Sequence, residues 1–346
     1  MALDPELRSG LVLPAICAPM FLVSGPDLVK HACAAGLMAG LPRHNARTFE
    51  VFTGWLREIR GWLDEHAERN PGGRVGPLAV NLSTRMEPAL LDDHLRTCSQ
   101  WGVKVIISAA GDPTELTKHV HEHGLKIFHD VTSLRFAEKA AAAGVDGMTC
   151  IGTGGGGKSG TISHLVFIPK VREMFSGTIV CAGAVTTGAA IRAAEMLGAD
   201  LAYLGTRFIA SRESMADPRY KQMLVDAGSP DLRYTAAVGG VPANWLAPSM
   251  RAAGVDPDAP PPVIGAPVAG QPGGGQPGAG LPPAAKPWKT VWSAGQGIDL
   301  IDDVPTAAEL VLRLRREYVA ACEKPDMADV ARILDRVADA GGDLPG

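Results

Sequence analysis

The sequence predicts an α/β fold, a (β/α)8 TIM barrel, and three observations lead there. Short apolar runs of strand length alternate with amphipathic stretches of helix length as far as residue 209. The apolar runs are continuous rather than alternating, which is typical of parallel strands buried on both faces. They number eight, in units of regular length. Eight βα units favour a closed barrel over the open doubly wound sheet, which also alternates.

Each element follows from local patterning. The strands are predicted at 11–20, 36–42, 77–83, 103–111, 125–132, 144–152, 177–185 and 200–209. Between them, apolar residues recur at three- and four-residue spacing, which predicts helices at 26–35, 48–69, 88–101, 113–123, 134–143, 165–175 and 188–197. Asp112, Ser133 and Thr187 stand where N-caps are expected. Glycines follow several helix ends, as they do at C′ positions.

The regular pattern breaks after residue 209. Residues 211–254 are interpreted as helical and irregular, and 256–287 as a flexible linker because proline and glycine dominate there. A strong amphipathic helix then follows and is expected to close the barrel. The predicted organisation is a barrel of residues 1–210 and 288–325, with an insertion of 211–287 over the barrel mouth. Residues 326–346 are expected to form a C-terminal helix and tail.

The composition limits the kinds of partner and the location that can be expected for this chain. The net charge of −4, without a basic stripe, argues against nucleic acid. No apolar run is long enough to span a membrane, and the acidic N-terminus does not read as a signal peptide. The six cysteines are scattered and are expected to be free thiols in a reducing compartment. We therefore expect a cytoplasmic protein, monomeric or homodimeric, that acts on a small molecule.

The stretch GTGGGGKS, from Gly152 to Ser159, matches the phosphate-binding loop of nucleotide hydrolases letter by letter. Its context contradicts that reading, because no helix follows directly and neither of the next two strands ends in a Mg²⁺-binding acid. In a barrel, glycines at the end of a strand let a ligand approach the backbone closely. The run His119, His121 and His123 is interpreted as a solvated helix end rather than a metal site.

Two loops predict a phosphate site. Gly183 ends strand seven, and Gly205 and Thr206 lie in strand eight; barrels frequently bind phosphate through backbone N–H groups of the loops after these two strands. The following helix begins near Thr187, and its N-terminal dipole favours an anion. Asn81 ends strand three, where it can hydrogen-bond a flat heteroaromatic ring. His129 and Asp130 end strand five on the same face, in a direct or a supporting role.

Several longer stretches carry a resemblance. They are "APM" at 18–20, "VNLS" at 80–83, "AEKAAAAGVDGM" at 137–148, "AAIRAAEMLGADLAYLGTRFIAS" at 189–211 and "VWSAGQGIDLIDD" at 291–303. In these the chain resembles the nitronate monooxygenase family, once called 2-nitropropane dioxygenases, which are FMN-dependent (β/α)8 barrels. Related sequences include NADH:quinone reductases and FMN-dependent enoyl-thioester reductases.

The resemblance implies roles for particular residues. Pro19 and Met20 would contact the flavin through their backbone, Asn81 would bind its ring, and Gly156 and Gln296 would lie against it. The phosphate would be held by Gly183, Ala184, Gly205 and Thr206.

The family usually has a histidine after strand six, where this chain has Lys158. Histidine can accept a proton near neutral pH, whereas lysine is a cation there and suits stabilisation of an anion. Lys158 would therefore pair with the substrate's charge, and His129 is the reserve candidate for proton transfer.

Three functions remain open at this point. The first, by family, is oxidation of an alkyl nitronate with O₂ to a carbonyl compound and nitrite. The second uses NAD(P)H as a co-substrate to reduce a quinone or an enoyl thioester on FMN. The third is a barrel that binds FMN or another phosphate ligand without turnover, which the loss of the usual histidine motivates.

Overall fold

The computed structural model describes residues 2–259, 281–323 and 336. Eight parallel strands form a closed barrel, in the order β1-β2-β3-β4-β5-β6-β8-β9. Their bounds are β1 Ala15–Cys17, β2 Met38–Pro42, β3 Leu78–Ser83, β4 Val103–Ala109, β5 Lys126–Val131, β6 Gly147–Ile151, β8 Thr178–Ala182 and β9 Leu201–Leu204. Each lies within one predicted apolar run, so the predicted TIM barrel is confirmed.

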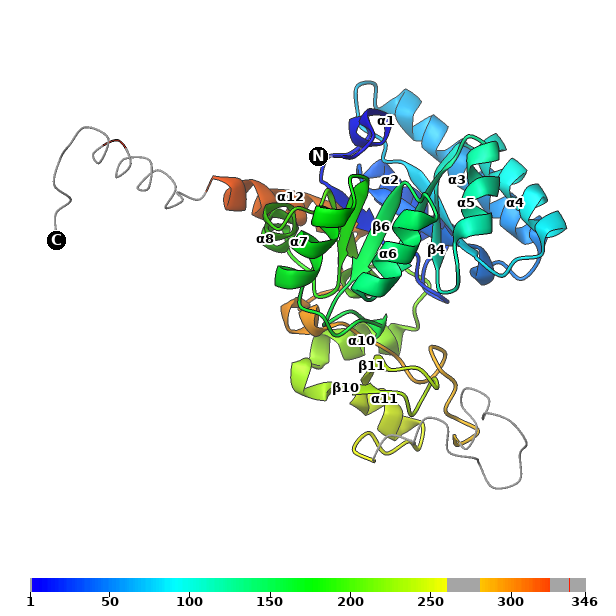
Figure 1. Cartoon of the computed structure of the whole chain (residues 1–346). Coiled ribbons are helices and arrows are strands. Elements are labelled where there is room, and N and C mark those ends of the chain that lie inside the picture. The colour runs from blue at the N-terminus through cyan, green and yellow to red at the C-terminus, as the bar shows by residue number, and fades with distance from the viewer. Residues whose placement is uncertain (1, 260–280, 324–335, 337–346) are drawn as a thin grey trace.

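Helices cover the outside of the barrel (Figure 1). They are α2 Pro26–Ala34, α3 Phe49–Arg69, α4 Pro88–Gln100, α5 Thr114–Glu122, α6 Leu134–Ala142, α7 His164–Met174, α8 Gly188–Met196 and α12 Ala307–Cys322. Ser133 and Thr187 cap α6 and α8 through their hydroxyls, as the sequence predicts. The amphipathic helix α12 packs against α8 and α2 and so completes the outer ring, also as predicted.

The core has two layers, set by the two-residue period of the strands. Inside the barrel, Ile16, Met38 and Phe128 form a small buried cluster. Leu3 and Leu7 join it from the N-terminal segment, where the short helix α1 (Pro5–Ser9) covers one end of the barrel. The larger cluster lies between strands and helices. On β5, Ile127 and Val131 belong to this outer layer and Phe128 to the inner one.

The segment after β9 contains a small sheet that the sequence reading did not anticipate. Two short helices, α9 (Thr206–Ile209) and α10 (Pro218–Asp226), come first there, followed by strands β10 (Leu232–Thr235) and β11 (Ala243–Leu246) and then by helix α11 (Ala247–Ala252). β11 pairs antiparallel with β10 and with β7 (Gly157–Lys158), which belongs to the glycine loop after β6. Figure 1 shows this unit gathered at one end of the barrel.

The segment from Val291 to Ile301, which includes the 3₁₀ helix Gln296–Leu300, returns the chain to the barrel. Trp292, Ala294 and Ile298 are buried against Val23 and Tyr220. Most of the predicted linker, residues 260–280, lies outside the described residues, as does the predicted C-terminal helix and tail apart from Arg336. In the described part of the chain, no helix combines the length and the apolar character that a membrane crossing requires.

Candidate active site

A cavity of about 540 Å³ opens at the C-terminal ends of the barrel strands. Its floor is made by the last residues of successive strands, among them Asn81, Ala109, Asp130, Ile151 and Ala182. Loops after the strands and the segment around Ser293 form its walls. This is the end of a TIM barrel at which active sites are found.

Nine of the eleven residues singled out from the sequence line this cavity: Pro19, Met20, Asn81, Gly156, Lys158, Gly183, Ala184, Gly205 and Thr206. His129 and Gln296 do not. Gln296 lies beside the cavity wall, because its N–H donates to Gly154 O at 2.9 Å. The geometry therefore brings together the ends of five strands, β1, β3, β6, β8 and β9, that are distant in the sequence.

The turn after β1 is held rigidly. Asn45 donates from Nδ2 to the carbonyls of Met20, at 3.0 Å, and Ser24, at 2.8 Å. The buried Ser24 hydroxyl accepts a hydrogen bond from Met20 N at 3.0 Å. Pro19 packs over Gly40, where a Cβ would come within 2.6 Å of the proline ring. The backbone at Pro19 and Met20 is thereby fixed at the cavity surface, with Asn45 as its supporting residue.

The loops after β8 and β9 form a cradle of backbone amides. Gly183 has φ +118° and Ala184 has φ +56°, a conformation unusual for a residue with a side chain. Such strain costs on the order of 1 kcal/mol or more and clusters at ligand sites. In the described part of the chain, the N–H groups of Gly183, Ala184, Gly205 and Thr206 donate no hydrogen bond. The loops thus present unpaired donors to the cavity.

The glycine loop after β6 is fastened by the inserted unit. The carbonyl of Gly155 accepts from Asn244 Nδ2 at 2.7 Å, and that of Ser159 accepts from the Tyr234 hydroxyl at 3.1 Å. Gly157 and Lys158 pair with β11, and the next helix begins only at His164. The loop is a strand edge beside the cavity, with none of the strand-to-helix geometry of a nucleotide hydrolase.

Lys158 projects from this edge and is exposed. Its Nζ lies 5.8 Å from the centre of the Trp288 ring, which also lines the cavity. No carboxylate of residues 2–259 or 281–323 forms an ion pair with it. Other lysines do pair with acids, namely Lys30, Lys104, Lys118, Lys126 and Lys170. Lys158 is therefore a cation at the cavity that has no ion-pair partner among the described residues.

His129 lies on the opposite side of its strand from the cavity. By alternation it shares the outer face of β5 with Ile127 and Val131, and its Nδ1 lies 2.8 Å from the buried Ser108 hydroxyl. Burial lowers the pKa of His129 to about 4, so the imidazole is neutral at physiological pH. The neighbouring Asp130 points the other way and lines the cavity. The two-residue period of a strand already required one of the pair to face outward.

The run His119, His121 and His123 does not converge on a shared point. His119 lies 3.5 Å from Glu122, His121 lies 2.9 Å from Asp146, and His123 lies 2.8 Å from Asp92. Within the described ranges, no three His, Cys, Asp or Glu side chains are grouped to hold a metal ion.

Comparison with known proteins adds three findings. A family model described as nitronate monooxygenase matches residues 75–317. A nitronate monooxygenase of Paraburkholderia phytofirmans is 28% identical over 91% of this chain and 94% of that protein. A Mycobacterium tuberculosis protein named (3aS,4S,5R,7aS)-5-hydroxy-7a-methyl-1-oxo-octahydro-1H-indene-4-carboxyl-CoA dehydrogenase is 25% identical over 68% of this chain and 64% of that protein.

Among solved structures, a nitroalkane oxidase of Streptomyces ansochromogenes is similar with a TM-score of 0.67. The alignment covers 91% of this chain and 98% of that chain at 23% sequence identity. At this level of identity the likeness concerns the fold.

Proposed function

The chain belongs to the nitronate monooxygenase family and is an oxidoreductase, and from this premise we propose an FMN-dependent enzyme that oxidises an alkyl nitronate with O₂ to a carbonyl compound and nitrite. The observation that carries the proposal is the pairing of two features in one cavity. Counting the described residues alone, backbone amides without acceptors lie at the β8 and β9 loops, and an ammonium without an ion-pair partner lies at the β6 loop.

The residues present fit FMN. The unpaired N–H groups of Gly183, Ala184, Gly205 and Thr206 suit a phosphate, which backbone amides bind at this position of TIM barrels. Asn81 donates from Nδ2 to the carbonyl of Ile107 at 3.1 Å and lines the cavity, so its Oδ1 can accept from a ligand there. Gly156 lies at the cavity surface without a side chain, so a flat ring can approach the backbone there.

Lys158 suits a substrate that is already an anion. A nitronate carries its negative charge before it binds, so no base is needed to form it. An ammonium beside the cavity lowers the energy of that anion by direct attraction and hydrogen bonding. A neutral nitroalkane would first have to lose a proton. Lys158 lines the cavity as a cation and His129 faces away from it, while burial favours the neutral acid form of Asp130, the carboxyl of the cavity. We infer that the enzyme accepts nitronates and not their neutral parents.

The protein's own part in the reaction is binding and shielding. The cradle and Asn81 would hold the cofactor, Lys158 would orient the substrate anion, and Trp288 and Tyr220 would cover the cavity with apolar surface. FMN, when bound, supplies the redox chemistry by taking electrons from the substrate and passing them to O₂.

The test begins with the purified protein and added FMN. Binding should give the yellow flavin spectrum, and an alkyl nitronate should then yield nitrite with consumption of O₂. The matched neutral nitroalkane, assayed at once before it ionises, should yield almost none. Equal nitrite from both compounds would contradict the role given to Lys158. A protein that binds no FMN would overturn the whole proposal.

A second candidate function is reduction of an enoyl thioester or quinone, with NAD(P)H as the electron source. The relative named as a carboxyl-CoA dehydrogenase favours a thioester substrate for part of this family. A third reading, binding of FMN without turnover, would require that neither a nitronate nor NAD(P)H reduces the bound flavin.

A further inference from the structure

Asp130 is the carboxylic acid of the cavity. It lies near the C-terminal end of β5, and among the described residues no other Asp or Glu lines the cavity. The register of the barrel pairs it with Ala109 of β4 and with Thr149 of β6. The Oδ1 atom of Asp130 and the Oγ1 atom of Thr149 are both buried and make no hydrogen bond of full geometry, although the two side chains lie within reach of each other. The rest of the Asp130 side chain is partly exposed at the cavity, where a ligand can give the carboxyl a better partner.

Among the residues that the structure describes, no cationic side chain forms an ion pair with this carboxyl, although Lys158 and His44 line the same cavity from the β6 and β2 loops. Tyr203 of β9 and Cys150 of β6 are titratable groups that interact electrostatically with the Asp130 carboxyl, and burial raises the pKa of both well above neutrality. Burial likewise raises the pKa of the Asp130 carboxyl to about 7. A ligand that displaces water from the cavity would bury it further.

We propose that Asp130 acts as a neutral carboxylic acid that donates a hydrogen bond to a carbonyl or imine acceptor on the ring of the bound cofactor. The inference rests on the proposed function for the identity of that cofactor. An aspartate in its ionised form accepts hydrogen bonds only, so it would repel such an acceptor. Loss of the Asp130 proton should therefore release the cofactor, and binding should hold that proton in place.

The binding test uses FMN with the full-length protein and three variants across pH 5.5 to 9. In the wild type, the Kd for FMN should rise about tenfold per pH unit once Asp130 ionises. D130N keeps a donor that does not titrate, so this rise should vanish. D130A should bind about five- to tenfold more weakly at low pH. E138Q removes an exposed carboxyl of α6 and should behave as the wild type. Comparison at each pH cancels the titration of FMN itself.

Identical pH profiles for the wild type and D130N, or wild-type binding that tightens as pH rises, would overturn the proposal. A second measurement needs neither FMN nor a variant: the Asp130 carboxyl carbon is titrated by NMR in the protein alone. Titration near neutrality supports the proposal, and titration at an ordinary carboxyl value of about 4 contradicts it. This second result stands even if the protein binds no FMN, so the two proposals fail separately.

Discussion

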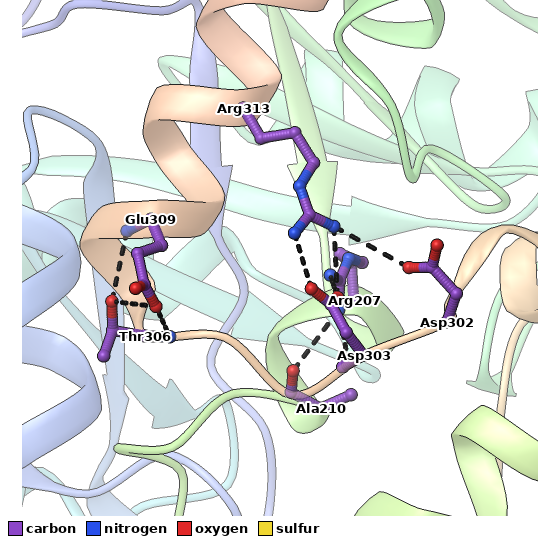
Figure 2. Close-up of polar contacts among 7 residues, drawn as sticks. All are labelled: Arg207, Ala210, Asp302, Asp303, Thr306, Glu309 and Arg313. Atoms are coloured by element: carbon purple, nitrogen blue, oxygen red, sulfur yellow. Dashed lines mark hydrogen bonds and ion pairs between the residues drawn. The ribbon is translucent and has the colours of Figure 1, made fainter.

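Arg207, which follows the cavity residue Thr206, is buried and forms an ion pair with the partly exposed Asp303 at 2.5 Å. Figure 2 shows Asp303 between Arg207 and Arg313, so that one carboxylate joins the β9 loop to helix α12. The Arg207 guanidinium also donates to the carbonyl of Ala210 at 3.3 Å. The segment that carries Ser293 and Gly295 into the cavity ends at Asp303. The ion pair therefore fixes one cavity wall to the barrel.

Loss of this ion pair should destabilise the protein. D303A leaves the Arg207 charge buried without a partner, and breaking such a pair costs about 3–5 kcal/mol when fully buried. Since the Asp303 side chain is 39% exposed, we expect about 2 kcal/mol. Urea unfolding measures this loss in the free energy of unfolding. D302N is the control, because Asp302 is 85% exposed and lies 3.7 Å from Arg313. An equal loss in both variants would contradict the special place of Asp303.

If the amide cradle binds the cofactor, a substitution there should weaken FMN binding, whereas a similar substitution elsewhere should lower only the stability of the protein. G183A forces a side chain into φ +118° and brings a Cβ within 3.1 Å of Gly155 N. G198A has the same backbone problem, at φ +106°, but its Cβ would meet nothing closer than 3.7 Å and it lies away from the cavity. Both should lose about 1–2 kcal/mol of stability. FMN titration should show weaker binding in G183A alone. Weakened binding in both variants would point to strain, not to the cradle.

Lys158 should matter for turnover and not for cofactor binding. K158A removes the cation that faces the substrate anion, so kcat/KM for a nitronate should fall about 10²- to 10³-fold. The Kd for FMN should stay within about threefold of the wild type, a change of less than 0.7 kcal/mol. K289A is the matched control, since Lys289 is an exposed lysine next to Trp288 that does not line the cavity. Steady-state kinetics on both variants measure this effect. An unchanged kcat/KM in K158A would exclude a role for Lys158 in stabilising the substrate anion.

His129 should shape the pH dependence of stability rather than of activity. Its pKa of about 4 lies below the unfolded value of about 6.5, so the unfolded chain binds a proton first as pH falls. Stability should rise between pH 4 and 6.5, with up to about 3 kcal/mol from this one group. H129N should flatten that part of the curve relative to H119N, an imidazole on the surface helix α5. Chemical denaturation across this range measures it, and parallel curves would contradict the assignment.

The barrel was predictable from the sequence because its signal is local. Each buried strand is a continuous apolar run, and helix caps such as Ser133 are set by one side chain. The cavity loops followed from chain order, since strands of a barrel must end on one face. Asn81, Gly183 and Thr206 are recognisable for that reason.

The remainder depends on contacts between distant segments. Strand β7 has two residues, and only its pairing with β11, far along the chain, makes it a strand. No local pattern marks such a short segment. Which of His129 and Asp130 faces the cavity depends on which residues of β5 point into the barrel. Phe128 packs inside the barrel, so Asp130 points inward and His129 points outward. Tyr203, Tyr220 and Trp288 reach the cavity through tertiary packing alone.

The central claim is that electrons enter a bound flavin from a nitronate. The most direct measurement is anaerobic mixing of the FMN-loaded protein with an alkyl nitronate or with NADH, following flavin absorbance by stopped flow. We expect the nitronate to bleach the flavin rapidly and NADH to leave it oxidised over the same time. Rapid bleaching by NADH with no response to the nitronate would contradict the account and support the reductase.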